Sequence, residues 1–132
     1  MTSEAFETGL RIRKEVLGDA YVERALQNAT DFDMPFQELM TATCWGMTWG
    51  REGLSRKQRS LNNLCMLAAL NRSTEFATHF RAAISNGCTL VELRETLIQI
   101  STYAGVPAGV EAFRIAKQVL ADLEAQGAAP KA

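Results

Sequence analysis

Hydrophobic and polar residues along this chain repeat mainly with the three-to-four spacing of amphipathic helices, and the strict alternation typical of strands is nearly absent. A first helix is predicted over 3–17, because Gly18 provides a left-handed stop, and Asp19 then caps a second helix that runs to Ala29. The helices predicted after these span about 33–49, 55–70, 73–86, 89–104 and 107–125. The pattern therefore predicts an all-α helical bundle of about seven helices.

Capping signals and apolar stripes add detail to three of these helices. Residues Thr89–Glu92 have the spacing of a capping box, as do residues Ser55–Gln58. The run LCMLAAL over Leu64–Leu70 is apolar on every side, which predicts a central helix with Cys65 buried as a small hydrophobe. The last helix has a broad apolar stripe made of Val110, Phe113, Ile115, Ala116, Val119 and Leu120.

The length of 132 residues predicts one domain over 1–125, followed by a flexible tail over 126–132. The net charge of −1 provides no general attraction for nucleic acid or for an anionic membrane. The short basic stretch Arg56–Arg59 lacks the interleaved aromatic residues of a nucleic-acid patch. We therefore expect neither nucleic acid nor membrane as a partner.

The cysteines and the N-terminal residues indicate a cellular compartment. Three widely spaced cysteines form no disulfide framework and suit a reducing environment. The acidic start MTSEAFETGL lacks the basic and then apolar layout of a signal peptide, and the longest apolar run is too short to cross a bilayer. These features predict a soluble, cytoplasmic protein.

The motifs also limit the chemistry. The sequence has no Cys-x-x-Cys pair and no Gly-rich phosphate loop, and a single histidine cannot complete a zinc site of normal ligand number. We therefore expect no metal and no cofactor.

The single histidine, His79, is the main candidate for chemistry. On a helix over 73–86 it shares the apolar stripe with Phe76 and Phe80, and Glu75 lies one turn earlier. The Glu75 carboxylate can reach the imidazole, fix its tautomer and favour its protonated form. Two interpretations remain open from spacing alone: a packed histidine with a local partner, or a group that moves a proton.

Three long stretches of the chain resemble the carboxymuconolactone decarboxylase family. They are FETGLRIRKEVLGDAYVERALQNATDFDMPFQEL, WGMTWGREGLSRKQRSLNNLCMLAALNRSTEFATHFRAAISNG and YAGVPAG. The resemblance covers about 6–122, and its most specific pieces are Arg59–Leu61, 69–72, Glu75-Phe76, His79 and Gly105-Val-Pro. It implies an all-α subunit with the fold of the AhpD-type alkylhydroperoxidases, assembled into a ring-like homohexamer.

The resemblance implies a cofactor-free decarboxylase. Its expected reaction converts 4-carboxymuconolactone to 3-oxoadipate enol-lactone in the protocatechuate branch of aromatic degradation. The unsaturated lactone accepts the electrons that carbon dioxide leaves behind, so no cofactor is needed. The implied catalytic residues are His79 and Glu75, with His79 as the proton donor. The implied substrate-binding residues are Arg59, Arg56, Arg72, Trp45, Trp49 and Tyr103.

Two other functions are considered. The first is a thiol-dependent peroxide reductase, since the peroxidase branch of the fold carries out dithiol chemistry with a Cys-x-x-Cys-x-x-x-His motif. When the histidine of that motif is aligned with His79, this chain has Arg72 and Glu75 in place of the two cysteines, and Ser60 in place of an upstream glutamate. A family member without catalysis, acting as a binding or assembly subunit, is the other alternative. It is kept because Met47 stands where the family's Trp-Gly-Glu-x-Trp pattern has a glutamate.

Overall fold

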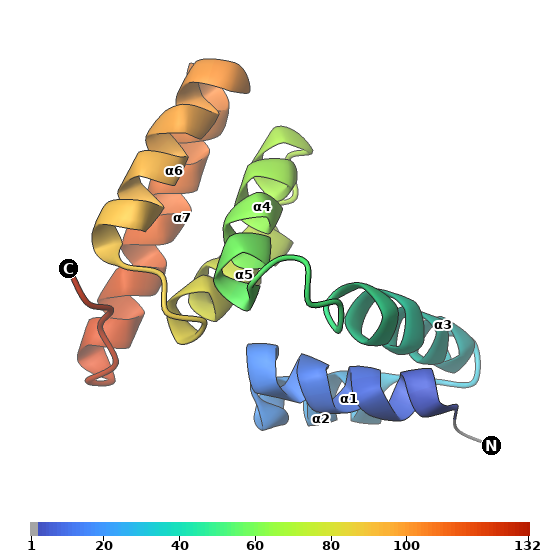
Figure 1. Cartoon of the computed structure of the whole chain (residues 1–132). Coiled ribbons are helices and arrows are strands. Elements are labelled where there is room, and N and C mark those ends of the chain that lie inside the picture. Colours follow the sequence, from blue (N-terminus) through green and yellow to red (C-terminus); the bar gives the residue numbers. More distant parts are fainter. Residues whose placement is uncertain (1–2) are drawn as a thin grey trace. The chain divides into compact units, whose positions relative to one another are not determined.

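The computed structural model describes residues 3–132, and within them the secondary structure consists of seven α-helices and one π-helix, η1 (Figure 1). In order they are α1 (Glu4–Leu17), α2 (Asp19–Asn28), α3 (Met34–Met40), η1 (Thr41–Thr48), α4 (Arg56–Ala69), α5 (Ser73–Ser85), α6 (Leu90–Tyr103) and α7 (Val106–Ala125). The all-α prediction is confirmed. The backbone packs into two compact units that meet in sequence after Ser55. The predicted single domain with a flexible tail stays a prediction.

In the first unit α1 packs closely against η1, because glycines remove the side chains that would separate the two backbones. A Cβ atom on Gly9 would lie 1.9 Å from the carbonyl oxygen of Thr41. A Cβ atom on Gly46 would lie 2.3 Å from the carbonyl oxygen of Ala5. Both distances are far inside van der Waals contact, so only glycine fits at these two positions.

A buried arginine ties α1 to the segment that follows. The Arg13 side chain is only 4% exposed, and its guanidinium donates to Gln37 Oε1 at 3.0 Å and to Thr41 Oγ1 at 3.2 Å. Burial lowers the pKa of Arg13. Neutral acceptors therefore hold a charged group in the interior of this unit, which makes α1, α3 and η1 depend on one another.

The third predicted helix has the expected extent, but its second half is of a different type. The backbone N–H of Trp49 donates to the carbonyl of Cys44, five residues earlier, at 3.0 Å. Trp45 and Trp49 are buried in this segment, and their rings stack with centroids 5.1 Å apart. The hydrophobic pattern did not reveal the π-helix, because an apolar segment of eight residues fits either helix type.

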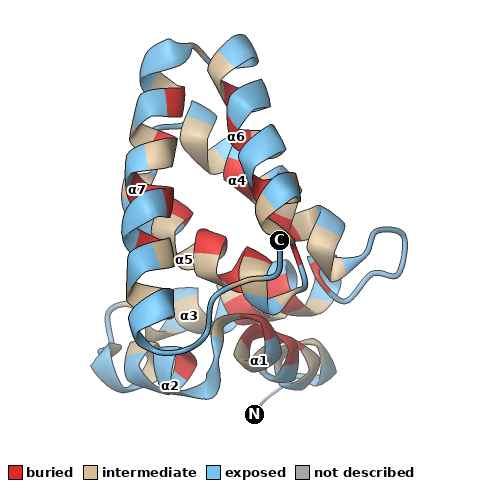
Figure 2. Ribbon diagram, turned by 90° about the vertical axis from the view of Figure 1, so that its left-hand side faces the viewer, coloured by how far each residue is buried: buried red, intermediate tan, exposed pale blue. Residues whose placement is uncertain are grey.

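The second unit is built from the hairpin of α4 and α5 and from the pair α6 and α7 (Figure 1). Figure 2 shows buried residues along α4, α6 and α7. The largest fully buried side chains of the second unit are Leu64, Phe76, Phe80, Leu93 and Leu97. This shared core fixes how α4 lies against α5.

Polar contacts at the start of α6 support this packing. The predicted capping box of Thr89 and Glu92 is confirmed, and Lys57 of α4 forms an ion pair with Glu92 at 2.8 Å. The hydrogen bond from Lys57 lowers the pKa of Glu92 to about 2. Beyond α7, the carbonyls of Lys131 and Ala132 accept the N–H groups of Leu90 and Val91. The start of α6 is therefore anchored from two directions.

The predicted burial of α4 on every side is wrong. Leu64 is fully buried, but Cys65 is exposed, and Met66 and Leu70 are 53% and 66% exposed. Within the second unit the neighbouring helices cover only the side of α4 that carries Leu64, so the other apolar side chains face outward. Val110, which was predicted in the buried stripe of α7, is likewise exposed.

No helix in the described part of the chain combines the length and the apolar character that crossing a membrane requires.

The close approach at Gly9 leads to a testable prediction. Gly9→Ala should destabilise the protein by about 1–3 kcal/mol or more, because the new methyl group would overlap a backbone atom that cannot move aside. Gly53→Ala is the matched control, since a Cβ atom there meets nothing within 4 Å. Urea unfolding followed by circular dichroism measures both variants. Equal unfolding midpoints would contradict the close packing of α1 on η1.

Candidate functional site

The α4–α5 hairpin brings together two polar faces with three-to-four spacing. The α4 face has Arg56, Arg59 and Asn63, and the α5 side, starting just before the helix, has Arg72, Glu75 and His79. All six residues lie in the second unit. Five of them were predicted as site residues, and Asn63 was not.

A side-chain contact joins the two faces. Asn63 Nδ2 lies 3.3 Å from His79 Nδ1, and both side chains are half-buried. On either side of His79 along α5, Phe76 and Phe80 are almost fully buried. The predicted apolar stripe of α5 is confirmed, and His79 lies at its polar edge.

The surroundings of His79 keep its ring neutral. Burial lowers the pKa of His79, and the negative charge of Glu75 opposes this effect without overcoming it. Glu75 therefore acts in the predicted direction, but the expectation that the protonated form is favoured overall is wrong, because desolvation outweighs an exposed carboxylate. The ordinary pKa of a histidine is about 6.5, so a pKa below that value leaves His79 mostly neutral at pH 7.

The arginines lie at different positions along the hairpin. Arg59 is half-buried and lies one turn before Asn63, or about 6 Å along the α4 axis, and Arg56 lies almost one turn further. Arg72 is exposed at the turn between the helices. Arg59 is thus the arginine whose turn adjoins the contact between Asn63 and His79.

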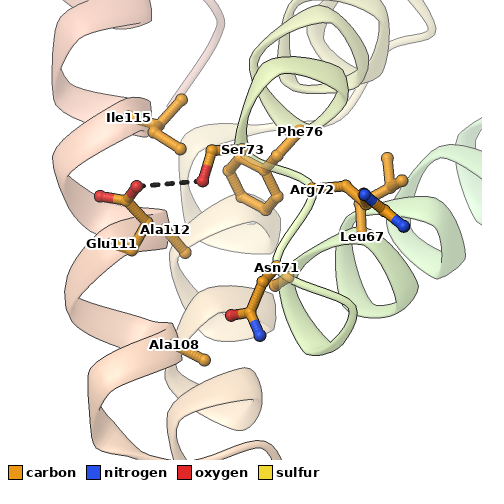
Figure 3. Close-up of a pocket in the computed structure, with 10 residues that line it drawn as sticks. Leu67, Asn71, Arg72, Ser73, Phe76, Ala108, Glu111, Ala112 and Ile115 are labelled. Atoms are coloured by element: carbon orange, nitrogen blue, oxygen red, sulfur yellow. Dashed lines mark hydrogen bonds between the residues drawn. The ribbon is translucent and has the colours of Figure 1, made fainter.

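Arg72 also borders a small cavity between this turn and α7 (Figure 3). The cavity measures about 20 Å³, which is room for a single water molecule. Ser73 donates to Glu111 Oε2 at 3.0 Å beside it, whereas the Arg72 side chain extends away from that bond (Figure 3). This cavity is too small for an organic substrate.

The predicted aromatic walls come from both units of the chain. Trp45 and Trp49 belong to the first unit, where they are buried and stacked. Tyr103 is 84% exposed and lines a groove between α4 and α6 together with Asn62 and Cys65. Because consecutive helical residues point about 100° apart, this is not the face of α4 that carries Asn63. The water-excluding role of these three aromatic residues stays a prediction.

The cysteines lack the properties of redox thiols. All three are free, and burial raises the pKa of the buried Cys88 to about 11. Desolvation also raises the pKa of Cys44 and Cys65. Since the thiolate is the reactive form, these shifts oppose dithiol chemistry at neutral pH.

Ser60 has a structural hydrogen bond at the position where the peroxidase branch has a glutamate. Its side chain is fully buried, and Ser60 Oγ accepts the Asn86 amide at 2.9 Å. Among residues 3–132 there is also no group of three or more acidic, histidine or cysteine side chains that could hold a metal ion.

The opposing effects at His79 generate a prediction. Glu75→Gln should lower the pKa of His79 further, because it removes a negative charge that supports the imidazolium. The chain has a single histidine, so one ring signal in an NMR titration reports this value directly. Glu95→Gln on the exposed side of α6 is the control and should leave the midpoint in place. An upward or absent shift for Glu75→Gln would disprove the interpretation.

Comparison with known proteins gives consistent results. Residues 35–118 match the carboxymuconolactone decarboxylase family. A nitrosuccinic acid decarboxylase of Metarhizium robertsii is 43% identical over 92% of this chain and 85% of its own length. A 4-carboxymuconolactone decarboxylase of Acinetobacter baylyi is 41% identical over 97% of this chain and 93% of its own length.

These names support the prediction of an enzyme of the carboxy-lyase class. The family match covers more than half of the chain, and both relatives align over nearly all of it. The chain therefore belongs to the carboxymuconolactone decarboxylase family.

Proposed function

We propose that this protein removes carbon dioxide, without a cofactor, from a small carboxylated molecule that contains its own electron acceptor. The observation that carries the proposal is the contact across the α4–α5 hairpin between the half-buried His79 and Asn63, which lies one turn after Arg59 on α4. A guanidinium can hold a carboxylate through paired hydrogen bonds, and an imidazole can move a proton. The two groups together suit the chemistry of a decarboxylated carbanion.

The first candidate substrate is 4-carboxymuconolactone, which the name of the Acinetobacter relative supports. As carbon dioxide leaves the γ-carbon, the bonding electrons move through the ring double bond into the lactone carbonyl. The resulting enolate then takes a proton at its α-carbon, which yields the enol-lactone. The substrate accepts and returns the electron pair, so the protein only binds, stabilises and protonates.

The side chains divide these tasks. Arg59, with Arg56 or Arg72, holds the carboxylates of the substrate through forked contacts. A hydrogen-bond donor at the enolate oxygen would contribute about 3–4 kcal/mol. His79 delivers the proton to the α-carbon from its imidazolium form, which a lowered pKa makes a stronger acid.

The second candidate substrate is nitrosuccinic acid, favoured by the name of the Metarhizium relative. Loss of the carboxyl group next to the nitro group leaves the electron pair on the nitro oxygens as a nitronate. Protonation of the same carbon completes the reaction. The protein tasks are unchanged: an arginine holds the remaining carboxylate and His79 supplies a proton. The Met47 departure from the family pattern is a further reason to test both substrates.

His79→Gln should cut turnover by about 10²–10⁴-fold, the usual worth of a positioned general acid, while the melting temperature stays close to that of the native protein. The assay follows carbon dioxide release from freshly prepared 4-carboxymuconolactone and, separately, from nitrosuccinic acid. Arg59→Lys is the companion variant, and it should mainly raise KM, because a lysine cannot form the forked contact.

The alternatives predict different outcomes in the same assays. Unchanged turnover per folded molecule in His79→Gln would make His79 a packed residue. No carbon dioxide from either substrate would favour a family member without catalysis. Dithiol-dependent peroxide turnover that disappears when all three cysteines are replaced would favour the peroxide reductase. A location in the cytoplasm stays a sequence-based prediction.

We also propose that the protein works as a homo-oligomer, with a ring-like hexamer as the expected form. Apolar side chains that one chain leaves in solvent support this, among them Met66, Leu70, Tyr103, Val106 and Val110. Light scattering at micromolar concentration should give a multiple of the chain mass of 14.5 kDa. A mass near 14.5 kDa itself would contradict the proposal.

A further inference from the structure

The segment around α3 leaves large apolar side chains in solvent. Phe32, just before the helix, is 95% exposed, and Phe36 and Leu39, three residues apart on one face of α3, are 61% and 62% exposed. Exposed apolar clusters of this kind mark contacts with a partner. We call Phe32, Phe36 and Leu39 the α3 patch.

The turn before α3 holds the backbone of Phe32 in place. Asp33 Oδ1 accepts hydrogen bonds from the backbone N–H of Thr30 at 2.6 Å and from its hydroxyl at 3.1 Å. The N–H of Phe32 donates to Thr30 Oγ1 at 3.3 Å, and the N–H of Met34 donates to the Thr30 carbonyl at 2.8 Å. An aromatic side chain on an ordered backbone loses little entropy on binding, which suits an anchor residue.

A groove of about 650 Å³ lies along α7 in the second unit, and we call it the α7 groove. Val106, Val110 and Phe113 line it with the spacing of one helix face, and Val106 and Val110 are 68% and 64% exposed. Ser101 of α6 lines it as well, and a Cβ atom on Gly109 would overlap the Ser101 side chain. The groove is therefore largely apolar and is built on two helices in close contact.

The two surfaces have complementary charges. The α3 patch is flanked by the exposed Asp31 and Glu38, and the chain has no lysine or arginine over 25–50. The α7 groove is bordered by Arg114 and Lys117, and none of the described residues that line it is acidic. Arg114 already pairs with a neighbouring carboxylate at 2.6 Å, whereas Lys117 forms no ion pair within the described part of the chain. Lys117 is thus the cation best suited to meet an acidic partner.

We propose that the α3 patch of one copy binds in the α7 groove of a second copy of this chain, with the acidic side chains beside Lys117. The proposal deepens the homo-oligomer proposed above and rests on it. A second copy is the occupant because the chain itself carries both halves of the contact, an apolar and acidic helix face and an apolar and basic groove. Since the contact joins two different surfaces, it is heterologous and can close into a ring.

Phe36→Asp and Val110→Asp test the two surfaces separately. Each places a charge inside the proposed contact, so each should give a smaller mass than the native protein in light scattering at micromolar concentration. Both positions are exposed in a single copy, so the variants should fold, and circular dichroism checks this. Val91→Asp is the matched control: Val91 is 47% exposed on α6 and lies outside both surfaces, so the mass should stay unchanged.

Mixing the two variants tests whether the contact is heterologous. Copies with Phe36→Asp retain an intact α7 groove, and copies with Val110→Asp retain an intact α3 patch. One native contact can then form between unlike copies, so the mass should rise above that of either variant alone. A contact between two identical surfaces would gain nothing from mixing.

Charge reversal tests the role of Lys117. Lys117→Glu should weaken self-association by about 10-fold or more, because it brings like charges together. Combining it with Asp31→Lys and Glu38→Lys should restore the association. Arg94→Glu, at an exposed position of α6, is the control for net charge and should have little effect.

An oligomer whose mass is unchanged in both Phe36→Asp and Val110→Asp would overturn the proposal and leave the homo-oligomer standing. A mixture that gains no mass would also overturn it, as would an equal loss of mass in Val91→Asp. A native protein that is monomeric at micromolar concentration would contradict both this contact and the homo-oligomer, and would leave the two surfaces to a different occupant. The decarboxylase proposal is decided separately, by carbon dioxide release.

Discussion

The packing of α4 against α5 around Leu64, Phe76 and Phe80 is the constraint on which the candidate site depends. Their side chains are fully or almost fully buried, and each would leave a cavity worth several kcal/mol if shortened to alanine. This core sets the register of the hairpin, and that register alone places Asn63 beside His79. The chemistry at the polar edge therefore depends on apolar contacts made one residue away.

The same burial gives the site its electrostatic character. A histidine close to an apolar core loses hydration, and this loss outweighs the attraction of an exposed carboxylate one turn away. Cations dominate the rest of the two faces, with Arg59 nearest to the contact along α4. Because the positive charge on these faces comes from the arginines, these are the groups suited to attract an anionic substrate.

Patterns within a single helix were predicted well, and contacts between helices were not. The stripe that contains His79 and the capping box of Thr89 follow from spacings of three and four residues, which an α-helix converts directly into neighbours. The pairing of Asn63 with His79 depends on how two helices interlock, and no spacing along the chain encodes it. Its nearest signal was the position of Asn63 one turn after Arg59, on a face already marked as polar.

The errors have the same origin. The apolar residues around α4 led to the prediction of a helix that is covered on all sides. Apolar residues such as Cys65 and Leu70, however, do not show which element covers them, and both are exposed in the single chain. That covering can come from another copy of the chain, which the sequence of one copy does not reveal.

The π-helix over Thr41–Thr48 contains more residues per turn than an α-helix does, because its N–H groups reach five residues back. A related chain that builds this segment from α-helical turns needs fewer residues to cover the same path. A structural alignment of two such chains contains a gap inside the segment, whereas a sequence alignment can run through the segment without a gap. Met47 lies within this segment. Met47 and the glutamate of the Trp-Gly-Glu-x-Trp pattern therefore occupy the same point in space only where both backbones widen in the same way.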